Sequence, residues 1–184
     1  MIAVDTNILV YAHREDSPWH HSACDHLVRL GEDAKPWAIP WPCLHEFLAI
    51  LTHPRIFKPP TPLQVACEQV DAWVESPRAL LLSETTNYWQ ALRQTVIEGK
   101  IQSPLVHDAR IASLCRHHGI QELWTADRDF SRFPHSFSSQ PTALINWGLS
   151  DGRSSFENSW TVANTHPDSY PTAKVGLFTT PQKK

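Results

Sequence analysis

The sequence predicts an α/β protein: a three-layer α/β/α, Rossmann-like domain around a mainly parallel sheet of four to five strands. Two observations carry this prediction. Short apolar runs alternate along the chain with segments whose apolar residues recur at helical spacing. The chain also opens on an apolar run too short for a helix, Ile2–Val4, that leads directly into Asp5. Alternating strands and helices favour a parallel sheet, and right-handed crossovers then place every strand-to-helix loop on one edge.

Each element follows from its local pattern. The expected strands are 2–5, 37–40, 80–82 and 122–125. The expected helices run from residue 6 to Arg14, from Ser17-Pro18 to a stop at Gly31, and over 42–52, 63–73 and 104–118. A further helix is expected to face inward with Trp89, Leu92 and Val96 and outward with Gln90, Arg93 and Gln94. Four prolines make 53–62 a loop, because proline disrupts both helix and sheet hydrogen bonding.

The domain organisation follows from a change in composition after about Pro141. Residues 1–147 are expected to form the α/β domain, with Leu144-Ile145-Asn146 as a last edge strand. Residues 148–184 are rich in Ser, Thr, Asn and Pro, and their aromatic residues show no periodicity. We expect a polar C-terminal tail that is partly disordered or draped on the domain.

Composition excludes several classes of protein. The 184 residues are 41% hydrophobic and 19% charged, as in a globular domain, and the net charge of −3 indicates no bulk attraction to nucleic acid or membrane. No apolar segment approaches the roughly 20 residues that span a bilayer, and no signal-like N-terminus is present. We expect a cytoplasmic protein with no membrane partner. Its four cysteines form no CxxC motif, which predicts buried, reduced thiols.

Four carboxylates stand where an apolar core or a strand end is expected. Asp108 shares a helical stripe with Ile111, Ala112 and Cys115, and Glu46 shares one with Cys43, Ala49 and Ile50, so both are expected to face inward. Asp5 and Asp127 follow two strands at the loop edge of the sheet. Four converging carboxylates cannot all stay ionised without cations or protons, which predicts a site for Mg²⁺ or Mn²⁺.

Taken singly, each acid has an ordinary explanation. Asp5 can cap the first helix, Asp108 can complement the dipole of its helix, and Asp127 can be a turn residue. Glu46 can pair with an arginine. The joint placement on one edge is what favours a metal site over these four explanations.

The segments around these acids resemble the PIN-domain ribonucleases, most closely the VapC-like toxins of type II toxin–antitoxin pairs. The resemblance covers about residues 1–141, in consistent order and spacing. The matching segments are Asp5-Thr6-Asn7-Ile8-Leu9-Val10-Tyr11-Ala12, Glu46-Phe47 followed by Leu51-Thr52, Asp108-Ala109-Arg110-Ile111-Ala112, and Thr125-Ala126-Asp127-Arg128-Asp129-Phe130.

The resemblance implies a PIN fold and a Mg²⁺- or Mn²⁺-dependent endoribonuclease that acts as a homodimer and is neutralised by a small antitoxin protein. Its acidic site corresponds to Asp5, Glu46, Asp108 and Asp127, with Asp129 as an auxiliary acid and Thr6 and Asn7 as supporting polar groups. The basic residues expected near RNA phosphates are Arg14, Arg110 and Arg128. The chain departs from the family in its tail, because such toxins usually end soon after the segment that contains Asp127.

Two other functions are compatible with parts of this pattern. A PIN module that binds RNA or protein without catalysis would share the fold, although a binding module has no need for four mutually repelling acids. A metal-dependent phosphatase or phosphotransferase could use Asp5 as a nucleophile. That chemistry commonly requires a second acid two residues later, where this chain has Asn7.

Overall fold

The sheet is parallel throughout and places the N-terminal strand in its interior. A computed structural model of the chain describes residues 1–133. Within them, four strands pair in the order β3-β2-β1-β4. The strands are β1 (Ile2–Val4), β2 (Trp37–Pro40), β3 (Ala79–Leu82) and β4 (Glu122–Trp124). The predicted fold class is confirmed, while the strand expected at 144–146 lies outside the described residues.

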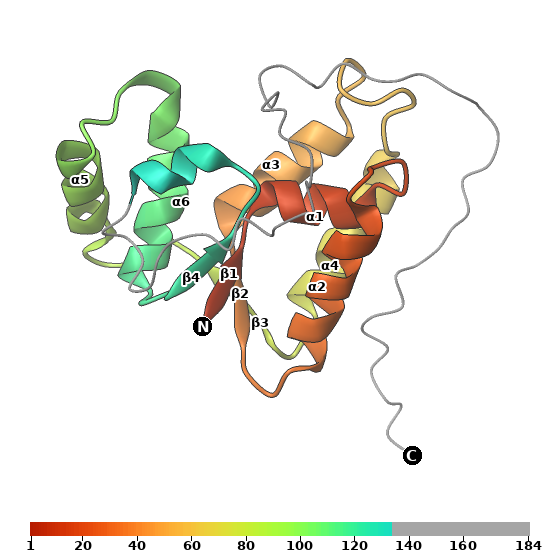
Figure 1. Cartoon of the computed structure of the whole chain (residues 1–184), viewed down its shortest axis with the longest axis horizontal. Helices are drawn as coiled ribbons and strands as arrows, with labels where there is room; N and C mark the ends of the chain where they lie inside the picture. Colours follow the sequence, from red (N-terminus) through yellow and green to blue (C-terminus); the bar gives the residue numbers. More distant parts are fainter. Residues whose placement is uncertain (134–184) are drawn as a thin grey trace, which may run out of the picture.

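Six α-helices and two short 3₁₀ segments connect these strands within residues 1–133 (Figure 1). The helices are α1 (Thr6–His13), α2 (His20–Glu32), α3 (Trp41–Leu51), α4 (Leu63–Val74), α5 (Tyr88–Glu98) and α6 (Val106–His117). The 3₁₀ segments are η1 (Ser103–Leu105) and η2 (Arg128–Arg132). Helices thus follow every strand, as the alternation in the sequence predicts.

The order of the strands decides which face each helix covers. The steps from β1 to β2 and from β2 to β3 move in one direction across the sheet, whereas the step from β3 to β4 returns past β2 and β1. Right-handed crossovers then put the helices of the two kinds of step on opposite faces. Figure 1 shows α2 and α4 on one side of the sheet and α5 and α6 on the other, with α1 and α3 beside the carboxyl ends of the strands.

The core is built around β1. Ala3 lies in register with Ala38 of β2 and Leu123 of β4, and all three are completely buried. A fully buried Leu or Ile contributes about 1.5–3 kcal/mol relative to an exposed one. Burial on both faces therefore holds β1 firmly, and with it the residue that follows the strand.

Several details differ from the sequence predictions. Trp89, predicted to lie on the inner face of α5, is 64% exposed, and the buried residues of that helix are Tyr88 and Thr95. Helix α2 continues one residue past Gly31, and the helix predicted from residue 104 begins at Val106 because η1 forms its first turn. All four cysteines are free thiols, but only Cys43 and Cys115 are buried.

No helix within residues 1–133 has the length and apolar character needed to cross a bilayer.

Candidate metal centre

Asp5 occupies the junction of the central strand and the first helix. Its backbone N–H donates to the carbonyl of Trp124 at 2.9 Å, so it lies directly beside the end of β4. It is also the N-cap of α1, and its carboxylate accepts from the N–H of Thr6 at 2.7 Å. Asp5 thus caps the helix, as its ordinary explanation suggested, but it is also only 3% exposed.

Both oxygens of the Asp5 carboxylate accept hydrogen bonds. In addition to the Thr6 amide, Oδ1 lies 3.7 Å from the thiol of Cys43 on α3. Oδ2 accepts from Asn7 Nδ2 at 2.9 Å and from Thr125 Oγ1 at 2.6 Å. These donors fix the orientation of the carboxylate and offset part of the cost of burying it.

Thr125 and Asn7 join the first strand to the segment after the last one. The Thr125 hydroxyl accepts from the backbone N–H of Asp127 at 2.9 Å, and Asn7 Oδ1 accepts from the N–H of Ala126 at 3.0 Å. Asp127 in turn caps η2, because its Oδ1 accepts from the N–H of Asp129 at 2.8 Å. The position of Asp127 is therefore coupled to that of Asp5 through a hydrogen-bond network.

Glu46 reaches the site from α3. Its Oε2 accepts from the Thr6 hydroxyl at 2.7 Å, which places it one side chain away from Asp5. Glu46 and Ala49 are exposed, so the predicted inward stripe with Cys43 is wrong in part. The helix buries Cys43, Leu44 and Phe47, and Glu46 lies at the margin of that face, where the site opens to solvent.

Asp108 reaches this edge of the sheet from α6, on the side that α5 and α6 cover. It lies in the first turn of α6 and is half-buried. Asp108, Asp127 and Asp129 each offer a carboxylate oxygen, and the three oxygens lie within 4.8 Å of one another. Asp129 therefore takes a more central place than the auxiliary one predicted for it, whereas Asp5 lies beside this trio and is engaged by its own donors.

The electrostatics reflect crowding of like charges. Burial raises the pKa of Asp5 to about 7, and the charges of Glu46 and Asp127 add to this effect. The hydrogen bonds from Thr125 and Thr6 act in the opposite direction. Burial likewise raises the pKa of Asp108 to about 6, with further increases from Asp127, Asp129 and Glu46. Glu46 and Asp127 thus raise the pKa of both Asp5 and Asp108.

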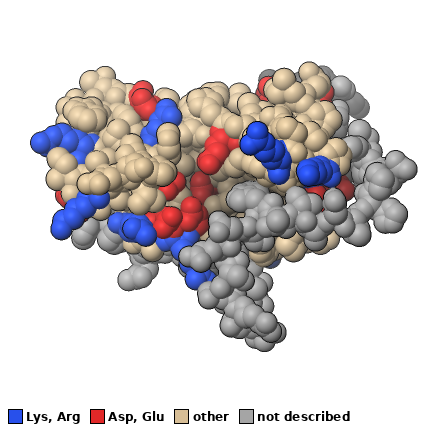
Figure 2. Space-filling model, turned by 90° about the horizontal axis from the view of Figure 1, so that it is seen from above, with Lys and Arg blue, Asp and Glu red and all other residues tan. Residues whose placement is uncertain are grey.

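The donor set fits a hard divalent cation. All the groups that crowd together are carboxylates, which accept hydrogen bonds and cannot donate them when ionised. Among the described residues, the only ion pair that reaches the trio joins Arg132 to Asp129, at 3.2 Å and close to solvent. Oxygen-only donors match Mg²⁺ or Mn²⁺ better than Zn²⁺, which favours histidine and cysteine. Figure 2 shows acidic side chains gathered near the middle of this face, with basic side chains around them.

The three arginines predicted to contact RNA differ in their surroundings. The Arg14 side chain is only 11% exposed, and its guanidinium is engaged by Asp16 and by the loop after α3. Arg110 pairs with Glu84 at 2.8 Å. Arg128, next to Asp127, is exposed and has no ion pair within residues 1–133. The geometry thus favours Arg128 as an RNA contact and gives Arg14 a structural role.

Two supporting residues were missed by the sequence predictions. Thr125 is completely buried and donates the shortest hydrogen bond to Asp5, and Cys43 places its thiol on the other oxygen. The sequence did indicate that Cys43 lies near the site, because it precedes Glu46 by three positions on the same predicted helix. Thr125 was visible only as a polar residue at the end of an apolar strand.

An α/β domain with a cluster of carboxylates at the carboxyl ends of β1 and β4 defines a class of proteins that can hold divalent cations there. Comparison with known proteins specifies the class further. The PIN domain family model matches residues 2–136. The chain belongs to the PIN-domain family.

Curated relatives are ribonucleases of the VapC type. Ribonuclease VapC43 from Mycobacterium tuberculosis is 35% identical over 133 residues, which cover 72% of this chain and 90% of that protein. Ribonuclease VapC48 from the same species is 31% identical over 129 residues, covering 70% of this chain and 89% of the relative. The predicted family is confirmed.

Solved structures show the same fold. The crystal structure of VapBC2 from Rickettsia felis, bound to a DNA fragment from its promoter, matches 77% of this chain and 98% of its own with a TM-score of 0.51. FitAcB from Neisseria gonorrhoeae matches 79% of this chain and 99% of its own with a TM-score of 0.52. Identities of 20% and 18% limit these two comparisons to the fold.

Proposed function

We propose that the protein is a divalent-metal-dependent endoribonuclease that hydrolyses RNA phosphodiester bonds and acts as the toxin of a VapBC-type pair. The observation that carries this proposal is the convergence of carboxylates from four separate segments on one edge of the sheet. The names of its VapC relatives, which are ribonucleases, support the choice of RNA as substrate.

The roles of the residues follow from their geometry. Asp108, Asp127 and Asp129 are the nearest carboxylates to one another and would hold the cation, with Asp5 fixed beside them. When bound, Mg²⁺ or Mn²⁺ supplies positive charge that neutralises phosphate oxygens and makes water more acidic. Glu46 is exposed and held by Thr6, so its other oxygen is free to orient the attacking water. Arg128 is proposed to contact a phosphate of the RNA, which its exposure and its position next to Asp127 support.

We also propose the wider context that the family suggests. The protein acts in the cytoplasm as a homodimer, and a small antitoxin protein encoded in the adjacent reading frame neutralises it. The proposed organisation is a nuclease domain of residues 1–147 followed by a polar C-terminal tail of residues 148–184, of which 134–184 lie outside the described residues. The neighbouring gene provides the simplest check, because a toxin of this kind requires a short DNA-binding partner beside it.

Cleavage of an end-labelled RNA tests the nuclease directly. The wild-type protein is expected to cut RNA with Mg²⁺ or Mn²⁺ and to stop when EDTA is added. Asp5→Asn and Asp108→Asn are expected to fold normally, by circular dichroism, and to lose cleavage by at least about a hundredfold. RNA binding without cleavage by the wild-type protein would instead indicate a non-catalytic PIN module, and wild-type activity in either variant would refute the site.

A further inference from the structure

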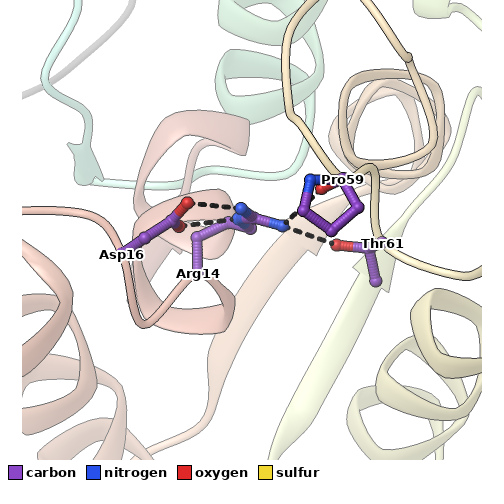
Figure 3. Close-up of polar contacts among 4 residues, drawn as sticks. All are labelled: Arg14, Asp16, Pro59 and Thr61. Atoms are coloured by element: carbon purple, nitrogen blue, oxygen red, sulfur yellow. Dashed lines mark hydrogen bonds and ion pairs between the residues drawn. The ribbon is translucent and has the colours of Figure 1, made fainter. Parts of the chain in front are cut away.

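Arg14 connects the end of α1 to the proline-rich loop that follows α3, defined here as residues 52–62 and called the α3–α4 loop. Its guanidinium donates to the carbonyl of Pro59 and to the hydroxyl of Thr61, each at 3.4 Å (Figure 3). It also lies 4.2 Å from the centre of the Phe57 ring. Asp16 accepts from the other side of the guanidinium. One largely shielded cation, with a side chain 11% exposed, therefore contacts three points of the loop.

Backbone contacts fix the same loop from within. Thr61 is buried, and its N–H donates to the carbonyl of Leu51 at 2.8 Å. The N–H groups of Ile56 and Phe57 donate to the carbonyl of His53 at 3.1 and 3.2 Å. Four prolines further restrict the backbone. The loop is thus held in one shape without any helix or strand of its own.

This loop presents unpaired positive charge. Residues 52–62 contain no Asp or Glu, and both of their cationic residues, Arg55 and Lys58, are exposed. Neither forms an ion pair with any residue in the described part of the chain, a property they share with other exposed cations such as Arg93 and Lys100. What distinguishes them is that both lie on one loop held in place by Arg14. Two exposed cations on one rigid loop, Arg55 and Lys58, favour an anionic ligand over a neutral one.

The loop stands at a fixed distance from the acidic centre. Helices α1 and α3 both begin at the carboxyl edge of the sheet and both end at the loop, with Asp5 at the start of α1 and Glu46 in the middle of α3. Arg14 follows Asp5 by nine positions, which corresponds to about 14 Å of helix.

Binding of RNA next to an acidic centre requires positive charge elsewhere on the protein surface. The carboxylates repel a polyanionic strand, so affinity for RNA has to come from positive groups outside the cluster. A rigid cationic loop at the far end of α1 meets this need, because order already present in the free protein reduces the entropic cost of binding.

We propose that the α3–α4 loop is a preformed RNA-backbone binding site, in which Arg55 and Lys58 contact phosphates of the strand on one side of the cut bond and Arg14 holds the loop in place. This inference rests on the proposed ribonuclease function, and it assigns binding to a surface separate from the acidic centre.

The test compares an Arg55→Ala/Lys58→Ala variant of the full chain with an Arg93→Ala/Lys100→Ala variant. Both remove two exposed cations, but Arg93 and Lys100 lie on and just after α5, at the far side of the molecule in Figure 1. Binding of a fluorescein-labelled 20-nucleotide single-stranded RNA is measured by anisotropy at several salt concentrations. An Asp108→Asn background prevents cleavage during the measurement.

The loop variant is expected to bind RNA about five- to tenfold more weakly at 0.1 M salt. Each lost phosphate contact on a single strand reduces the slope of log K against log salt by about 0.7, so the slope is expected to shrink by about 1.4. The α5 variant is expected to keep the slope. In the active background, the loop variant is expected to raise KM and leave kcat within about twofold.

The outcomes separate this inference from the nuclease proposal. Cleavage by the wild-type protein together with equal slopes for the two double variants overturns the loop site and leaves the nuclease intact. A loop-specific change in slope without cleavage by the wild type supports the loop site and refutes the nuclease. Failure of the Asp108→Asn protein to bind the RNA at all overturns the loop site.

Discussion

The hydroxyl of Thr125 lies 2.6 Å from Oδ2 of Asp5, a contact between two residues separated by 120 positions in the chain. The same hydroxyl accepts from the N–H of Asp127. One oxygen atom therefore joins the carboxylate after β1 to the backbone that positions the acids after β4. Thr125 acts through these groups, so it is a positioning residue.

Replacing Thr125 with Val tests this coupling while keeping the shape of the side chain. The variant leaves the N–H of Asp127 without its acceptor and removes one donor from Asp5, so the free energy of unfolding is expected to fall by about 1–3 kcal/mol. The lost hydrogen bond also lowered the pKa of Asp5, so the acid limb of the cleavage profile is expected to move to higher pH. Thr125→Ser retains the hydroxyl and is expected to restore the wild-type profile; urea unfolding and a pH series measure both effects.

The raised pKa of Asp5 predicts how the stability of the metal-free protein depends on pH. The folded state binds a proton more tightly than the unfolded state, whose carboxyl has the ordinary value of 3.8. Between about pH 4 and pH 7 the folded protein therefore holds more protons, and its stability falls as pH rises. Asp108, with a pKa of about 6, adds to this trend.

Melting curves in EDTA at pH 5.5 and 7.5 measure this effect. The wild-type protein is expected to lose more stability between these two values than Asp5→Asn, which has no carboxyl to titrate at that position. Saturating Mg²⁺ is expected to reduce the difference, because a cation favours the ionised acids. Equal pH dependence in the two proteins would contradict the assignment of a raised pKa to Asp5.

Cation binding is expected to depend on the carboxylate trio. Asp127→Asn removes a charge from the group of Asp108, Asp127 and Asp129, so the affinity for Mg²⁺ is expected to fall at least about tenfold. The exposed Asp71 on α4 provides a matched control, because Asp71→Asn makes the same chemical change outside the trio. Thermal shift against Mg²⁺ concentration compares the two variants, and equal losses would show that the trio is not the binding site.

The contacts of Arg14 predict that lysine cannot replace it. Arg14→Lys keeps the charge but loses the planar fork that reaches Asp16, Pro59 and Thr61, so the free energy of unfolding is expected to fall by about 1–2 kcal/mol. Arg110→Lys, at an exposed pair with Glu84, is expected to cost less than about 0.5 kcal/mol. Chemical denaturation of the two variants checks this contrast. Similar losses would mean that Arg14 is an ordinary surface cation.

The sequence was most informative where a residue type conflicted with its local pattern. Asp5 after an apolar strand and Asp108 on an apolar helical face both pointed to the acidic edge, and alternation of strands and helices predicted the parallel sheet. Periodicity identifies the faces of a helix but not what covers each face, which is why Trp89 was assigned to the core and Glu46 to an inward stripe. The hydrogen bonds of Thr125 and Arg14 depend on strand order and loop shape, which the local pattern does not contain.

The pairing of β1 with β4 has a consequence for synthesis of the protein. The first strand emerges from the ribosome early, but its partner strand and the acids at 127 and 129 follow more than a hundred residues later. A nascent chain that ends between residues 108 and 122 has Asp5, Glu46 and Asp108 but lacks β4, so it cannot form the edge of the sheet beside which these acids lie. The fold thereby delays assembly of a centre proposed to cut RNA until most of the chain has been translated.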